Sequence, residues 1–248
     1  MRLNRVLVSV VFAFLVSAST LPQSDRFVGE GQPETVEQAL QRHHVALTKS
    51  SLVAALRSQD AEVRRLAAQK LSGDGAKDTV PSIIKALEAE TVPLDQLNIA
   101  FSVAALGGEK GLATLRNTCE DTAAPGSIRM LAAQLMQNLH NDYCRDAVLD
   151  ILRSDGDPDA RIAALSIVPT WQHLSEDDSR MILDLVVRAM GDQASGVRMT
   201  ASSTLGRLGN VSAIPFLQTA LAKEQNDACR LEMGMDLQRL QKEEQHPR

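Results

Sequence analysis

The feature that most constrains the fold of this chain is a residue pair, apolar then arginine, that recurs at nearly even intervals. The second residue of each pair stands at positions 64, 99, 129, 161, 198 and 230, so the intervals are 35, 30, 32, 37 and 32 residues. Mostly small residues follow three and four positions later, and a large aliphatic residue follows at seven. The copy at Asn98-Ile99 is degenerate, because isoleucine stands where the arginine should be. A period in the mid-thirties predicts a stack of helical repeats.

Residues 191–221 show what one repeat contains. One apolar face at helical spacing is formed by Val197, Ala201, Leu205 and Leu208. Gly209 and Asn210 then end this helix, since either residue adopts the left-handed conformation that a helix end needs. A second apolar face follows at Ile214, Leu217 and Leu221. Such a helix pair cannot bury its own apolar faces, so neighbouring pairs must cover them, and the sequence predicts an all-α fold.

The pattern Asp-x-x-Val-Arg-x-x-Ala-Ala-x-x-Leu, followed after a turn by Ala-x-x-x-Val/Ile-Pro-x-Ile/Leu, resembles HEAT repeats. The best copies are 60–87 and 197–221, and the resemblance runs from Ser51 to Leu240. It implies a right-handed α-solenoid of about six helix pairs, with first helices on one curved face and second helices on the other.

The resemblance also implies a ladder of charged residues that bridges neighbouring repeats. Its expected members are Asp60, Arg64, Arg129, Asp157, Arg161, Asp192, Arg198, Asp227 and Arg230. An aspartate just before a second helix is also suited to cap that helix. Because these charges recur at one place in every unit, a structural role is favoured over ligand binding.

The first eighteen residues have the pattern of a secretory signal peptide. Arg2 and Arg5 precede the apolar run Val6–Val16, and small residues up to Ala18 offer a cleavage site. The run is shorter than the roughly 20 apolar residues of a membrane span. We therefore expect an exported protein, periplasmic or secreted, with no membrane span after cleavage. An uncleaved segment that tethers the chain to a membrane is the alternative.

The remaining sequence divides into four expected parts. These are a flexible lead-in at 19–33, a capping helix at 34–47, the repeats at 51–241 and a charged tail at 242–248. Removal of Arg2 and Arg5 takes the formal charge from −5 to −7. Nucleic-acid binding needs a concentrated basic face, and here the basic residues are interleaved with acidic ones, so we expect no nucleic-acid partner.

Two groups of residues, an acidic cluster and the histidines, are candidate reactive or metal sites. Glu176, Asp177 and Asp178 follow Ser175 in the first turn of a helix, where acidic residues favour the helix dipole. His43 and His44 are adjacent and cannot both face one metal from a helix, and His140 and His173 have no partner at ligand spacing. We expect no catalytic residue, no metal and no cofactor.

The three cysteines, Cys119, Cys144 and Cys229, allow at most one disulfide within the chain. Cys119 is expected to end one first helix and Cys144 to begin the next. In parallel neighbouring helices of ten residues the two sulfurs would lie about 15 Å apart. A disulfide requires Cα atoms within about 7 Å. We therefore expect no intrachain disulfide.

The function expected from the resemblance is that of a non-catalytic scaffold, since most HEAT-type proteins bind a protein or peptide partner on an extended surface. Exposed positions of the second helices and the lone tryptophan are the candidate contacts: Gln69, Gln134, Gln137, Arg207, Gln238 and Trp171. For Trp171 the alternative is a plug over the edge of the repeats. A minority of the family, similar to bilin lyases and to a group of DNA glycosylases, carry out chemistry or hold modified bases. A small-ligand or lyase-like protein with a pocket between repeats is therefore the alternative function, although the residues that distinguish those groups are not found here. A third possibility is a repeat module that only forms homo-oligomers through its end units, which the charged tail at 241–248 disfavours.

Overall fold

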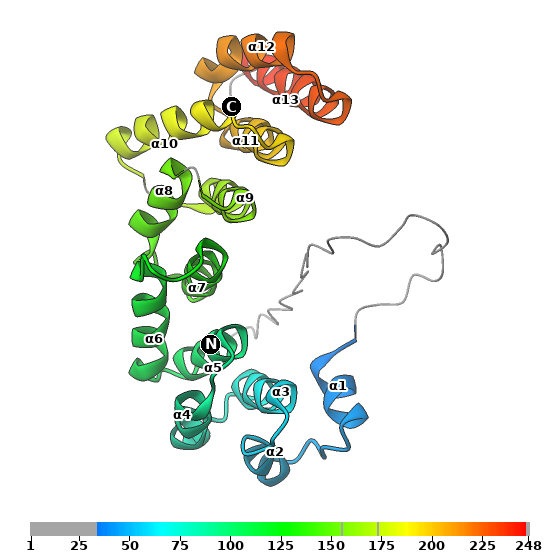
Figure 1. The fold of residues 1–248 in the computed structure, drawn as a ribbon, viewed down its shortest axis with the longest axis vertical. Coiled ribbons are helices and arrows are strands. Elements are labelled where there is room, and N and C mark those ends of the chain that lie inside the picture. Colours follow the sequence, from blue (N-terminus) through cyan, green and yellow to red (C-terminus); the bar gives the residue numbers. More distant parts are fainter. Residues whose placement is uncertain (1–33, 155, 173, 247–248) are drawn as a thin grey trace, which may run out of the picture. The chain divides into compact units, whose positions relative to one another are not determined.

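The computed structural model describes residues 34–154, 156–172 and 174–246, and these contain thirteen α-helices, three short 3-10 helices and no strand (Figure 1). The first helices of the successive pairs are α2 (Lys49–Ala55), α4 (Val80–Ala89), α6 (Glu109–Glu120), α8 (Arg145–Arg153), α10 (Glu176–Ala189) and α12 (Ile214–Lys223). The second helices are α3 (Ala61–Gly73), α5 (Pro93–Ala105), α7 (Gly126–Asn138), α9 (Pro158–Ile167), α11 (Ser195–Leu208) and α13 (Asp227–Gln245). Outside the pairs lie α1 (Val36–Arg42), η1 (Lys77–Thr79), η2 (Val168–Thr170) and η3 (Val211–Ala213).

The second helices form a continuous layer. Each of them packs against the next, from α3 against α5 through to α11 against α13, and each first helix packs against the second helix of its own pair. Figure 1 shows α3, α5, α7 and α9 nearly end-on in a row, with α4, α6 and α8 along one flank. The all-α class and the stack of six helix pairs, an α-solenoid, are therefore confirmed.

Small residues on the second helices explain the close packing of this layer. Ala67 and Ala68 of α3 are completely buried, and so is Ala132 of α7. Ala and Ser at these positions let the backbones approach, while the aliphatic residue three or four positions further on fills the space between layers. Leu71 in α3 and Met136 in α7 are such residues, and both are almost fully buried.

Local signals set the ends of the helices. Asp60 accepts a hydrogen bond from the backbone N–H of Glu62 at the start of α3, and Asp157 caps α9 in the same way. The last repeat differs, because Asn226 caps α13 and Asp227 is the first residue inside that helix. Gly209 ends α11 with φ of 65°, a left-handed conformation that costs glycine nothing.

The start of the described chain is a short helix that packs against α3. In α1, Thr35 and Gln38 form a reciprocal capping box, and the helix buries Ala39 and Leu40. The expected signal peptide at 1–18 and lead-in at 19–33 lie outside the described residues. None of the helices in the described ranges is long and apolar enough to cross a membrane.

The prediction that no intrachain disulfide forms is wrong. Cys119 and Cys144 are joined by a disulfide, and their Cα atoms lie 6.0 Å apart. Cys119 lies one residue before the end of α6, and Cys144 directly precedes α8. Cys229 is the free cysteine of the described chain, and it is buried.

The error came from the assumed direction of the helices. The prediction treated α6 and α8 as parallel neighbours, so that the end of one would lie a helix length from the start of the other. Figure 1 shows α6 in the plane of the view and α7 nearly end-on, so α7 does not carry the chain back along α6. As a result α8 follows α6 end to end, and the two cysteines meet at the junction.

Candidate binding surface

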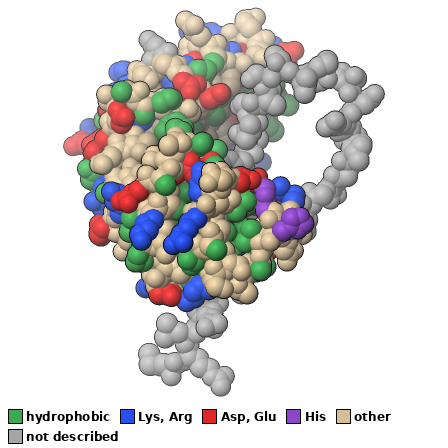
Figure 2. All heavy atoms as spheres, turned by 60° about the horizontal axis from the view of Figure 1, so that its bottom comes forward, with side chains coloured by type: hydrophobic (Ala, Val, Ile, Leu, Met, Phe, Trp, Pro, Cys, Tyr) green, Lys and Arg blue, Asp and Glu red, His purple; other side chains and the backbone are tan. Residues whose placement is uncertain are grey.

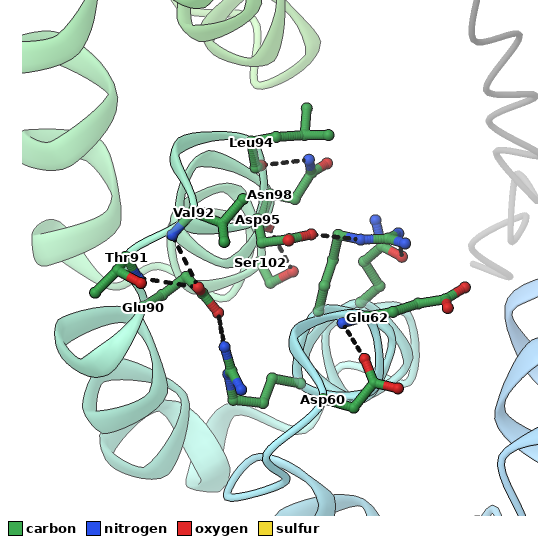
Figure 3. Close-up of polar contacts among 12 residues, drawn as sticks. Asp60, Glu62, Glu90, Thr91, Val92, Leu94, Asp95, Asn98 and Ser102 are labelled. Atoms are coloured by element: carbon green, nitrogen blue, oxygen red, sulfur yellow. Dashed lines mark hydrogen bonds and ion pairs between the residues drawn. The ribbon is translucent and has the colours of Figure 1, made fainter. Parts of the chain in front are cut away.

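The most regular polar feature is an ion pair between an arginine of one repeat and a carboxylate of the next. In α3, Arg64 donates from Nε and Nη2 to Glu90 Oε2 at 3.0 and 2.6 Å. Its Nη1 donates to the backbone carbonyls of Ser58 and Gln59, in the turn before α3. Figure 3 shows Glu90 also receiving the backbone N–H groups of the two residues after it. The Arg64 guanidinium therefore joins the turn before α3 to the turn between α4 and α5 in the next repeat.

The same arrangement recurs towards the other end of the stack. Arg198 of α11 donates to both carboxylate oxygens of Glu224 at 2.6 and 2.7 Å, and to carbonyls in the turn before its own helix. Arg161 of α9 pairs with Asp192 at 2.9 and 3.0 Å. These carboxylates are buried or nearly so, and burial of a charge is tolerated because each is paired and hydrogen-bonded.

Two of the three carboxylate partners were missed by sequence reasoning. Glu90 and Glu224 are the C-caps of their first helices, whereas the acidic members of the ladder were expected just before the second helices. A usable signal was present, since each glutamate stands 26 residues after its arginine. Of the aspartates expected in the ladder, Asp192 bridges two repeats, while Asp60 and Asp157 serve as caps within their own repeat.

Hydrogen bonds decide the ionisation of these glutamates. The hydrogen bond from Arg198 is the largest effect on Glu224 and, with the N–H of Asn226, lowers the pKa of its carboxyl to about 2 despite burial. Burial by itself would raise the pKa of Glu90, but the hydrogen bonds from the N–H of Val92 and from Arg64 outweigh it and lower that pKa. Both carboxylates are therefore anionic at neutral pH and structural in role.

The ladder is interrupted at three positions. Ile99 has no charge to offer, and Arg129 donates to the carbonyl of Cys119 within its own repeat. Arg230 in the last repeat lies 3.8 Å from Asp227 on its own helix, and more than half of its side chain is exposed.

The six residues predicted to contact a partner lie on four of the second helices, α3, α7, α11 and α13, and in the turn after η2. Gln137 donates to the hydroxyl of Thr170, and both Gln137 and Trp171 line a hollow of about 10 Å³, which is too small for a ligand. Gln69 lies on α3 beside Arg65, and Gln134 lies on α7. Arg207 on α11 makes a long contact, 3.5 Å, with the carbonyl of Ser166. Gln238 lies on α13 at the far end of the row.

Trp171 lies in the turn after η2 and is only partly exposed. The guanidinium carbon of Arg145 lies 5.5 Å from the centre of its ring, and Arg145 also donates to the carbonyl of Gln172 and to Asp142. The ring packs against the core between α7 and α9. This environment matches the plug over the edge of the repeats more closely than a free anchor.

An open groove lies between the first helices α10 and α12. Its volume is about 520 Å³, and its apolar lining includes Val187, Met190, Phe216 and Ala220. Phe216 is 49% exposed, so much of its ring faces the open groove. The Arg198–Glu224 pair and Lys223 complete the wall. Lys223 is the one charged group of this wall that forms no ion pair in the described structure.

The candidate reactive residues that the structure describes take part in a helix cap and in ion pairs. Ser175 accepts a hydrogen bond from the N–H of Asp178 at the start of α10, and Asp177 pairs with Arg180. His43 lies between Asp60 and Glu62, at 3.6 and 3.2 Å. His173 lies outside the described residues. Within the described ranges no three His, Cys, Asp or Glu residues are grouped so as to hold a metal ion.

The free thiol is buried, and its pKa is raised. Cys229 is almost fully buried in α13, and burial together with the neighbouring Glu224 raises the pKa of its thiol to about 11. The thiol therefore stays protonated at neutral pH.

The surface at the α2–α4 end of the row has mixed charge. Figure 2 shows Lys, Arg, Asp and Glu side chains scattered there among apolar and uncharged groups. No continuous patch of one sign appears on the visible part of the described residues.

Stacked helix pairs joined by arginine–carboxylate bridges define a helical-repeat protein. Residues 145–237 match the family model for HEAT repeats, so the part of the chain from α8 into α13 carries HEAT repeats. No curated protein sequence matches this chain.

Two solved structures are similar to this chain at low sequence identity. Human deoxyhypusine hydroxylase in complex with glycerol is 18% identical, over 84% of this chain and 83% of that chain, with a TM-score of 0.42. The complex of CpcE and CpcF of phycocyanin lyase from a Nostoc species is 19% identical, over 88% of this chain and 100% of that chain, with a TM-score of 0.37.

Proposed function

We propose that this protein is an exported, non-catalytic scaffold that binds an apolar segment of a partner protein in the groove between α10 and α12. The observation that carries the proposal is the half-exposed Phe216 in an open, apolar groove of about 520 Å³. Aromatic side chains in such positions are the residues that most often dominate binding energy.

The charges of the groove favour an acidic partner segment. Arg198 and Glu224 neutralise each other, so their charges are already compensated. Lys223, also in the lining, forms no ion pair with a carboxylate among the described residues, and a carboxylate of the bound segment would supply one. We therefore expect a segment with apolar side chains on one side and an acidic residue near one end.

Export is supported by two independent features. The basic and apolar start of the sequence has the pattern of a signal peptide. The Cys119–Cys144 disulfide is of the kind that persists in oxidising compartments outside the cytosol.

Site-specific photo-cross-linking in the native host tests the proposal. A photoreactive residue at Thr219 in the groove should capture a defined partner, and Phe216→Asp in the same chain should abolish that capture. The matched control is Val211→Asp, because Val211 is also exposed, at 39%, but lies on η3 and not among the lining residues of the groove. Equal capture by the two variants would contradict the assignment of the groove.

A small apolar ligand is a second candidate, because the volume of the groove lies within the range of ligand pockets. An apolar fluorescent probe distinguishes the two occupants. Tight, saturable binding of the probe that Phe216→Asp removes, together with no protein captured at Thr219, would favour the ligand. Weak probe binding with protein capture would favour the peptide.

A further inference from the structure

Within the described residues, the helix α13 leaves an apolar face uncovered. Leu231 and Met235 of α13 are 67% and 47% exposed, and Leu231 is the most exposed of the large hydrophobic residues described. They line a hollow of about 820 Å³ with Gly234 and Gln238. A side chain added at Gly234 would meet nothing within 4 Å, so another backbone can approach there.

The same positions in the preceding repeat are covered by a helix. Counted from the arginines at 198 and 230, Ser202 of α11 corresponds to Gly234 of α13, and Gly206 corresponds to Gln238. Ser202 donates to Asp236 of α13 at 2.7 Å, and a Cβ at Gly206 would lie 2.7 Å from that carboxylate. The exposed positions of α13 therefore correspond to the positions of α11 that a neighbouring helix covers.

The two ends of the row differ in chemistry. At the other end, α1 covers α3 and turns Gln38 and Gln41 outward, and its buried residues are only Ala39 and Leu40. Solvent-facing helices with polar outer faces are the usual ends of repeat stacks. Because α1 offers no apolar stripe, a head-to-tail contact between two copies would leave Leu231 without an apolar partner.

The free face of α13 is instead complementary to itself. Asp227 stands at its start and Lys242 at its end, fifteen residues apart, which is close to four helical turns and keeps them on one side with Leu231 and Gln238. Asp227 is almost completely exposed and lies 3.8 Å from Arg230, a contact too long and too exposed to hold it. Lys242 is exposed and takes part in no ion pair among the described residues. In an antiparallel pair of such helices the acidic end of one meets the basic end of the other, with Gly234 and Met235 near the centre.

We propose that α13 is a dimerisation surface that pairs antiparallel with α13 of a second copy of this chain. Asp227 then faces Lys242 of the partner subunit, and Leu231 and Met235 become buried across the two-fold axis. A two-fold contact of one surface with itself is the commonest form of protein self-association.

The test is the oligomeric state of the full chain, measured by sedimentation velocity across a concentration series. We expect a dimer, and Leu231→Asp should raise its dissociation constant about 30-fold or more while helix content and thermal unfolding stay unchanged. Phe216→Asp is the matched control and should leave the dimer intact.

Charge reversal tests the antiparallel arrangement. Asp227→Lys and Lys242→Asp should each weaken the dimer, and the double variant should restore it. A chain that is monomeric at all concentrations, a dimer insensitive to Leu231→Asp, or a double variant no better than the single ones would overturn the proposal. A different protein captured on α13 of a monomeric chain would also overturn it. None of these outcomes depends on what occupies the groove between α10 and α12.

Discussion

At the scale of single residues, the buried glutamates link the repeats in a way that depends on pH. The pKa of Glu224 is about 2 in the folded chain and 4.5 for a free side chain. Because the folded value is the lower one, the ionised carboxylate stabilises the fold above pH 4.5. This contribution is lost as the pH falls from about 4.5 towards 2.

Glu224→Gln is therefore expected to lower the free energy of unfolding at pH 7 by about 3 kcal/mol. The difference from the wild type should shrink steadily below pH 4.5, which urea unfolding at a series of pH values measures. Asp78→Asn is the control, because the Lys49–Asp78 pair is more than half exposed and solvent weakens it, so little change is expected. A constant difference between pH 7 and pH 2.5 would show that Glu224 acts through packing rather than charge.

Individual residues also show what the sequence can and cannot reveal about polar contacts. The positions of Arg64 and Arg198 were readable because their apolar neighbours repeat in register. Their carboxylate partners are marked only by a spacing of 26 residues that two repeats share, and no local motif around either glutamate indicates the bridge. Glu90, the C-cap of α4, is buried, whereas Glu88 two residues earlier is exposed. No local pattern in the sequence distinguishes the two glutamates.

At the scale of helices, the contact between α5 and α6 depends on the absence of a side chain. A Cβ at Gly111 of α6 would lie 2.6 Å from the backbone nitrogen of Ala104 and 2.9 Å from Cβ of Val103. Backbone atoms of α5 cannot move aside without moving the whole helix. Gly111→Ala is therefore expected to destabilise the fold by about 1–3 kcal/mol, although alanine is the better helix former.

Gly73→Ala is the matched control for this contact. Gly73 ends α3 and has nothing within 4 Å of an added Cβ, so the gain in helix propensity should stabilise the chain by up to about 1 kcal/mol. Thermal unfolding of both variants gives opposite shifts if the reasoning is correct. Equal shifts of the unfolding temperature in the two variants would mean that α6 is not closely packed against α5 at Gly111.

Helix directions were harder to predict than the helices themselves. Apolar spacing and caps such as Asp60 placed the second helices, because those signals are local. The angle at which α6 crosses α7 follows from side-chain packing along the whole contact, and no short pattern encodes it. The disulfide between Cys119 and Cys144 was missed for this reason, since its formation depends on that angle.

At the scale of the whole row, the ion-pair ladder fails in the middle and the disulfide lies where it fails. Ile99 of α5 offers no charge, and Arg129 of α7 reaches only the carbonyl of Cys119. The Cys119–Cys144 bond joins α6 to α8 across this region. Here a covalent link replaces the bridges that Arg64 provides before this point and that Arg161 and Arg198 provide after it.

Removal of that link should therefore open the row in its middle before its ends. In the variant Cys119→Ser/Cys144→Ser, we expect the free energy of unfolding to fall by about 3 kcal/mol, as for a closed loop of this length. Hydrogen exchange followed by mass spectrometry should show faster exchange first in α6, α7 and α8, because repeat stacks open where neighbouring contacts are weakest. Cys229→Ser leaves the disulfide in place and serves as the control for loss of a thiol. If exchange instead rises evenly from α3 to α13, the repeats open as a single unit and the disulfide does not compensate for a local gap in the ladder.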